Sequence, residues 1–219
     1  MAGFILWEGD SLYEGSPIVV IATMTSGNVK TGDMVQTWIL RRDVSPIEAS
    51  RLGLDKAICG NCPHMGKPDA SKAKGWARER SCYVNLLQGP LGIWKAYSAG
   101  RYPVVDRVTL KTLASGKMVR IGSYGDPACV PLGIWKDLTA ESEGWTAYTH
   151  AEKNPLPEML MTSADSLEQA QAAWARGERT FRIVPDVSGV ATGKEILCPA
   201  SKEAGFRSTC ADCRLCNGA

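Results

Sequence analysis

Four of the eight cysteines fall in the final segment of the chain, LCPASKEAGFRSTCADCRLCNGA. Cys210, Cys213 and Cys216 follow one another at intervals of three, and Cys198 stands in a Cys-Pro step twelve residues before the first of them. Two consecutive Cys-x-x-Cys steps can place three thiolates around an iron–sulfur cubane, and ferredoxin-type clusters combine such a run with a remote cysteine beside a proline. The spacing therefore predicts a [4Fe–4S] cluster on these four cysteines, in an electron-transfer, structural or undetermined redox role.

Zinc is the alternative metal for the same four thiols, because all-cysteine tetrahedral zinc sites are common. Structural zinc sites usually draw their ligands as two separated pairs, and a run of three equally spaced thiols is less typical of them. With zinc, the protein would be a metal-stabilised binding module for nucleic acid or a host protein. Four cysteines saturate one cluster and leave no iron position open, so the sequence does not decide whether the protein is an enzyme.

A second group of possible ligands begins in the sequence CGNCPH, which supplies Cys59, Cys62 and His64, with Cys82 twenty residues after Cys62. Three cysteines and a histidine can close a zinc site or hold a second cluster. Two other interpretations stay open. One is a Cys-x-x-Cys redox pair, and the other is a set of thiols that line a cavity without metal. Cys129 has no partner at ligand spacing and is expected to be a small buried hydrophobic residue.

Polar side chains also gather at the predicted carboxyl ends of strands, where parallel α/β proteins usually carry their functional residues. We expect six of them to line one pocket, which Cys198 would also border: Tyr124, Asp126, Tyr148, His150, Ser163 and Asp165. Some have a structural interpretation as well. Asp126 before proline is a common turn former, and Asp165 or Ser166 can cap the helix that follows.

The elements that must position these residues alternate between strands and helices. Apolar, β-branched or alternating runs predict strands at 16–27, 32–43, 117–127, 145–150, 158–165, 179–184 and 195–198. Helix starts and helix-forming residues predict helices at 45–55, 130–142 and 166–178, the first with a capping box of Ser45 and Glu48 around Pro46. This order indicates an α/β fold with a mainly parallel sheet, possible also as a partial (β/α) barrel, after an antiparallel N-terminal strand region.

The expected organisation is one α/β domain over residues 1–196, in which 59–82 is a metal-binding or loop insertion. The cysteine-rich tail, 197–219, is expected to bind the cluster and to pack on the same domain.

The composition is that of an ordinary globular protein, with 219 residues, 44% of them hydrophobic, and a formal net charge of +2. Basic residues are scattered, which argues against strong nucleic-acid binding. No apolar run approaches the roughly 18 residues that span a bilayer, and the start of the chain does not resemble a signal peptide. We therefore expect a cytoplasmic protein with no membrane association, whose clustered cysteines hold metal rather than form disulfides.

At VRIGSYGDPACVP, TAYTH and CPASKEAGFRSTCADCRLC the sequence resembles a family of uncharacterised tailed-bacteriophage proteins, related to the actinobacterial-phage gene-88-type proteins. The resemblance covers most of the chain and implies a viral protein of the host cytoplasm with an unknown redox or host partner. It implies no particular activity. More distantly, the alternating strands and thiolate cluster are similar to radical-SAM partial barrels. The chain lacks their Cys-x3-Cys-x2-Cys motif, which argues against radical chemistry.

Overall fold

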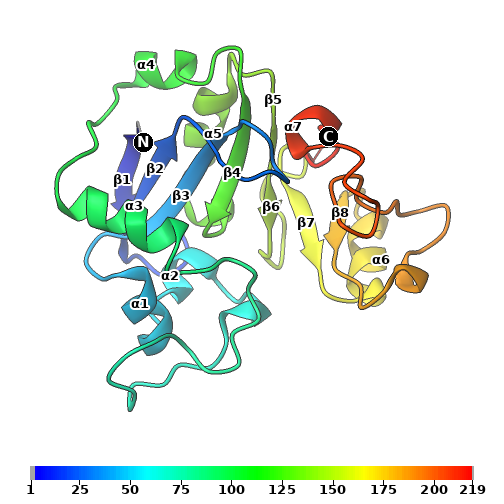
Figure 1. Ribbon diagram of the computed structural model, residues 1–219, viewed down its shortest axis with the longest axis horizontal. Helices are drawn as coiled ribbons and strands as arrows, with labels where there is room; N and C mark the ends of the chain where they lie inside the picture. Colours follow the sequence, from blue (N-terminus) through cyan, green and yellow to red (C-terminus); the bar gives the residue numbers. More distant parts are fainter. Residues whose placement is uncertain (1–2, 219) are drawn as a thin grey trace.

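The computed structural model describes residues 3–218 and divides its strands between two sheets (Figure 1). The first sheet has the order β1-β2-β3-β4-β5, with strands β1 (Gly3–Asp10), β2 (Pro17–Thr23), β3 (Val35–Arg41), β4 (Met118–Tyr124) and β5 (Gly144–Thr146). β1, β2 and β3 pair in antiparallel fashion, whereas β4 is parallel to both β3 and β5. The predicted antiparallel N-terminal region is therefore confirmed.

The second sheet has the order β6-β7-β8 and is entirely parallel, with strands β6 (Tyr148–Thr149), β7 (Met161–Ala164) and β8 (Thr180–Arg182). Helix α6 (Leu167–Ala175) connects β7 to β8 and packs on both of them. A strand, a helix and a second parallel strand form the βαβ unit that the sequence pattern predicts. The α/β class is confirmed, and within the described residues the two sheets do not close into a barrel.

The first sheet contains the core of the protein. Ile18, Val19, Val20, Ile21 and Ala22 of β2 are all fully buried, which explains why this strand is an unbroken apolar run and not an alternating one. Helices α1 (Pro46–Leu52), α2 (Lys56–Cys59) and α3 (Gly89–Ser98) all contact β3. Helices α4 (Arg107–Thr112) and α5 (Leu132–Thr139) pack against each other.

Two helix starts follow the predicted capping chemistry. The Ser45 hydroxyl accepts a hydrogen bond from the Glu48 main-chain N–H at the start of α1, and Pro46 occupies the first turn. At α6 the cap is Ser166, whose hydroxyl accepts from the Gln169 N–H at 3.1 Å. Because Ser166 caps the helix, the Asp165 carboxylate is available for other contacts.

The segment between α2 and α3 is the long loop that the sequence predicts, with one short 3₁₀ turn, η1 (Pro63–Met65). It folds back on itself, since Lys67 and Arg78 form an isolated antiparallel bridge. Gly66 has a φ of 83°, and a Cβ at this position would clash with the Arg78 carbonyl oxygen. A residue without a side chain is therefore needed where the two arms of the loop meet.

Ala147 is the residue at which the chain passes from the first sheet to the second. Its carbonyl accepts a hydrogen bond from the Met161 N–H at 3.0 Å, which starts the second sheet. Its own N–H donates to the Cys216 carbonyl at 2.9 Å, so the tail runs against the joint between the sheets.

The predicted strand at 195–198 is wrong. These residues have no regular secondary structure, and Ile196 is 69% exposed. The segment is held by side chains instead, because Glu195 accepts two hydrogen bonds from the Arg182 guanidinium of β8, at 2.8 and 2.6 Å. Within residues 3–218 no helix is both long enough and apolar enough to cross a membrane.

Candidate metal centres

The four cysteines of the tail lie close to one another. Cys210 and Cys213 stand at the two ends of α7 (Cys210–Cys213), which Thr209 caps, and Arg214 ends the helix with a φ of 57°. The chain then turns so that Cys216 comes back beside the others. Burial raises the pKa of the Cys216 thiol and a hydrogen bond from Tyr148 lowers it, while the nearby thiols of Cys198, Cys210 and Cys213 raise it further.

Positive charge accompanies this thiol group. Burial raises the pKa of Cys210, but the cationic side chains of Arg120 and Lys30 oppose that rise. The Lys30 carbonyl also accepts the Cys210 N–H at 3.0 Å. Arg120 projects from β4 and also donates to the Tyr83 hydroxyl at 2.9 Å. Thiolates bound to metal carry excess negative charge, so two cations beside them are favourable.

The tail is tethered to the rest of the molecule by contacts from several elements. The Trp145 indole N–H donates to the Asn217 carbonyl at 3.0 Å, and the Arg179 guanidinium donates to the Leu215 carbonyl at 2.8 Å. Arg214 forms an ion pair with Glu143 at 2.7 Å. Glu143 and Arg179 directly precede β5 and β8, and Trp145 lies in the three-residue strand β5. The tail therefore lies at the amino ends of these parallel strands, at the upper right of Figure 1.

This position contradicts the expectation that Cys198 borders the same pocket as Asp126 and His150. Cys198 does not leave a strand at its carboxyl end, and its neighbouring thiols lie at the opposite end of the parallel strands. Of the six predicted pocket residues, Tyr148 belongs with the tail. Its hydroxyl lies beside the Cys216 thiol and lowers the pKa of that thiol, and its ring packs edge-on against Phe181 with centroids 5.0 Å apart. Half-buried Ser163 pairs with Phe181 in the register of β7 and β8.

Asp126 organises the carboxyl ends of the parallel strands. Its buried carboxylate accepts hydrogen bonds from the Thr149 hydroxyl and the His150 N–H, both at 2.7 Å, and from the Ala128 N–H at 3.0 Å. Burial raises the pKa of Asp126, and these three donors oppose the rise. Asp126 is thus both the turn former that the sequence predicts and a link between β4 and β6.

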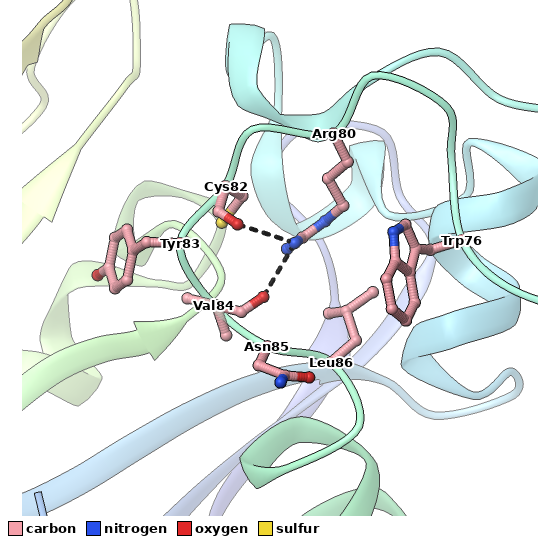
Figure 2. Close-up of a pocket in the computed structure, with 7 residues that line it drawn as sticks. All are labelled: Trp76, Arg80, Cys82, Tyr83, Val84, Asn85 and Leu86. Atoms are coloured by element: carbon pink, nitrogen blue, oxygen red, sulfur yellow. Dashed lines mark hydrogen bonds between the residues drawn. The ribbon is translucent and has the colours of Figure 1, made fainter.

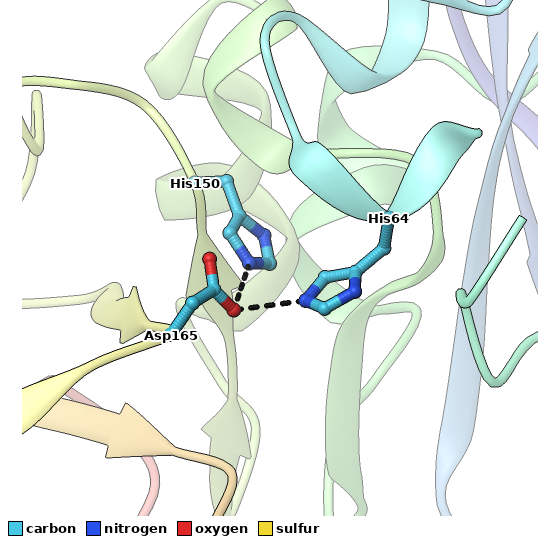
Figure 3. Close-up of side chains that lie close together, drawn as sticks. All are labelled: His64, His150 and Asp165. Atoms are coloured by element: carbon cyan, nitrogen blue, oxygen red, sulfur yellow. Dashed lines mark hydrogen bonds and ion pairs between the residues drawn. The ribbon is translucent and has the colours of Figure 1, made fainter. Parts of the chain in front are cut away.

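His64, His150 and Asp165 meet at this same end (Figure 3). The His64 Nε2 donates to the Asp165 Oδ1 at 2.8 Å, and the His150 Nε2 stands 3.8 Å from that oxygen. The two imidazole rings are arranged edge-on with centroids 5.6 Å apart. Burial lowers the pKa of His150. The charges of Asp165 and Asp126 oppose this effect, but the pKa remains below its usual value, which favours a neutral imidazole. The side chains of all three residues are about one-quarter exposed.

Cys59, Cys62 and Cys82 lie beside this histidine group. Burial is the main cause that raises the pKa of the Cys59 thiol, and the neighbouring charges of Asp55, Cys62 and Cys82 raise it further. Burial likewise raises the pKa of Cys62 to about 11, although the nearby His64 main-chain N–H opposes the rise.

The loop between α2 and α3 therefore brings the three cysteines of the predicted second site together. It turns the His64 ring away toward Asp165. Buried Tyr124 stands next to Cys59 and Cys82, and its hydroxyl has no hydrogen-bond partner among the described residues. Cys129 is fully buried, as expected for a small hydrophobic residue.

A surface pocket of about 230 Å³ lies on the loop before α3 (Figure 2), lined by Trp76, Arg80, Cys82, Tyr83, Val84, Asn85 and Leu86. Arg80 shapes it by donating to the carbonyls of Cys82 and Val84, at 3.1 and 2.9 Å. Of the predicted site residues only Cys82 borders this pocket. The pocket is therefore not the concave site that the sequence predicts around Asp126 and His150. Single aromatic and basic residues in a loop carry no periodic signal from which such a pocket could be predicted.

In comparisons with known proteins, no family model, no curated protein and no solved structure matches the chain.

Proposed function

We propose that this chain binds a [4Fe–4S] cluster through Cys198, Cys210, Cys213 and Cys216. One observation carries the proposal: four cysteines, none of them in a disulfide, are gathered at one place by a tail that is tethered to two sheets. Thiolates are the ligands that iron–sulfur clusters require, and four of them complete the ligand set of one cubane.

The spacing of the thiols along the chain favours a cluster over a single zinc ion. Structural zinc sites usually draw their ligands as two separated pairs, whereas three of the tail cysteines follow one another at intervals of three. Two consecutive Cys-x-x-Cys steps and a remote cysteine beside a proline are the pattern of ferredoxin-type clusters.

The surroundings support an electron-transfer or structural role. The four cysteines are half-buried, which shields a cluster from water on one side and leaves the other side open to a partner. Arg120, Lys30 and the Tyr148 hydroxyl supply positive charge and a hydrogen bond to the sulfurs, which are the features that tune cluster potentials. Four thiolates leave no iron position for a substrate. The origin in a bacteriophage, the host cytoplasm and a host partner are proposed from the sequence resemblance alone.

Metal analysis of protein produced with iron and purified without oxygen tests the proposal. We expect brown protein with broad visible absorption and about four irons per chain beyond any metal held elsewhere. Colourless protein with stoichiometric zinc on the tail thiols would contradict it and favour the alternative, a zinc-stabilised binding module. In that case a steep dependence of DNA affinity on salt would indicate nucleic acid as the partner.

A further inference from the structure

We propose that His64, His150 and Asp165 form a binding site for one divalent transition-metal ion, separate from the thiol group of the tail. The three residues come from distant parts of the chain: η1, the end of β6 and the end of β7. Their nearest ligand atoms all lie within 4.8 Å of one another, and no other group of three such ligands is this tight within residues 3–218.

The distances between these atoms suit a shared ion. Imidazole nitrogens and carboxylate oxygens bind zinc at about 2.0–2.2 Å, so two of them on one tetrahedral ion stand roughly 3.3–3.5 Å apart. The Asp165 Oδ1 stands 2.8 Å from the His64 Nε2 and 3.8 Å from the His150 Nε2. A small movement of the carboxylate away from His64 would make the two distances equal and open space for the ion.

Each ligand residue is held by a further contact, and at His64 it is the ring contact that is usual in established metal sites. The His64 Nδ1 meets the Ser81 hydroxyl at 2.8 Å, which directs the Nε2 toward Asp165. The His150 main chain is held by the buried Asp126 carboxylate, and the Asp165 N–H donates to the Gln169 side chain at 2.7 Å. The His64 ring and the main chains of His150 and Asp165 are therefore held without a metal ion.

The donor set selects the kind of metal. Two imidazoles and one carboxylate suit zinc, iron and their neighbours, whereas magnesium and calcium prefer oxygen ligands alone. Three protein ligands leave one or more coordination positions open, and the quarter-exposed side chains give water or a small anionic or carbonyl ligand access to them. The site differs in this respect from the tail thiols, which saturate their cluster.

Histidine NMR can test this site directly, because the chain contains only two histidines and both lie in it. Every imidazole signal of the complete protein, with its tail metal in place, therefore reports on the site. On titration with Zn²⁺ we expect the Nε2 signals of both rings to shift together and to saturate at one ion per chain, whereas Mg²⁺ should leave them unchanged.

Substitution separates ligation from a simple His–Asp hydrogen bond. Asp165→Asn keeps the size of the side chain but removes the carboxylate ligand. Loss of an outer-shell partner typically weakens metal binding about 10–100-fold, so loss of this direct ligand should weaken Zn²⁺ binding by at least that factor. Ser81→Ala, which removes only the orienting contact, should cost less. Glu168→Gln, an exposed acid three residues from Asp165, is the matched control and should bind as the unchanged protein does.

Two results would overturn the proposal. One is a Zn²⁺ titration that leaves both imidazole signals in place. The other is a Co²⁺ titration that produces a thiolate charge-transfer band, if that band is lost in Cys62→Ser. The cysteines beside the site, and not the histidines, would then be the ligands. Circular dichroism of each variant confirms that a loss of binding is not a loss of folding.

Discussion

The two ends of the parallel strands carry two different kinds of candidate ligand group. At the amino ends the tail brings four thiols together from one short stretch of chain, Cys198 to Cys216. At the carboxyl ends the histidine group joins His64 to Asp165, which are 101 residues apart. One group depends on local spacing and on a few tethers, whereas the other depends on the correct docking of a loop against two strands.

This difference has energetic consequences. If the tail binds the proposed cluster, metal binding and tail folding should be coupled, because the four thiols lie on one short segment. Side chains at the carboxyl ends of strands are positioned by the sheet itself and by Asp126. We therefore expect changes at one end to leave the other end largely intact. The following predictions test the ends in turn, and Asp126→Asn tests both at once.

The largest effect is expected from Cys213→Ser. It removes a central thiol of the tail, so the chain should lose nearly all of its tail-bound iron, and the residues after Ser201 should become sensitive to protease because the tail loses its cross-link. Iron analysis and limited proteolysis measure the two effects. Cys129→Ser is the control, since Cys129 is fully buried and is not one of the tail thiols. If Cys129→Ser strips the iron instead, the ligand assignment is wrong.

Asp126→Asn should have the largest effect on stability at the carboxyl ends. Both carboxylate oxygens accept hydrogen bonds, and an amide has only one oxygen, so the NH₂ group of the substituted side chain would face a donor such as the His150 N–H. Because at least one hydrogen bond is then lost, we expect the free energy of unfolding to fall by about 2–3 kcal/mol. Zn²⁺ affinity at the histidine group should fall as well, while tail iron stays unchanged. Urea unfolding checks the first effect. Exposed Glu152→Gln, two residues from His150, should change stability by less than about 0.5 kcal/mol.

Glu195→Gln should weaken the attachment of the segment that leads into Cys198. Hydrogen bonds from Arg182 lower the pKa of Glu195 below its usual 4.5, so the folded protein binds this proton less readily than the unfolded chain does. The stabilisation is therefore present above pH 4.5 and is lost as the pH falls through the lowered value. We expect a difference of about 1–2 kcal/mol at pH 7 between the original and substituted proteins.

Urea unfolding of metal-free protein over a pH series measures this difference. It should shrink toward zero at the acid end of the series. A difference that is constant with pH would show that the Glu195 charge is not the source of the stabilisation.

The smallest effect is expected from Trp145→Phe. The substitution keeps the aromatic ring but removes the indole N–H that the carbonyls of Met159 and Asn217 share. We expect a loss of about 1 kcal/mol and faster amide hydrogen exchange in the tail around Asn217. Trp174→Phe removes an indole bond to the Thr180 hydroxyl instead and should not change exchange in the tail. Equal effects of the two substitutions would mean that the Trp145 tether is not specific.

Much of the fold could be predicted from local patterns. The apolar run of β2 and the serine caps of α1 and α6 act within a few residues, so their signals are visible in the sequence. The strand expected at 195–198 fails for a physical reason. Ile196 finds no core to cover it, and the Glu195 contact with Arg182 holds the segment in place of main-chain pairing.

The sequence alone determined the thiols of the tail and their spacing, because the intervals between ligands are a local property of the chain. Only the tertiary structure decided which residues surround each group. Cys216 lies beside Tyr148 because the tail enters the joint at Ala147, and His64 meets Asp165 because a folded loop docks beside β7. The two groups meet opposite ends of the same parallel strands, and no local pattern states at which end a distant loop or tail will dock.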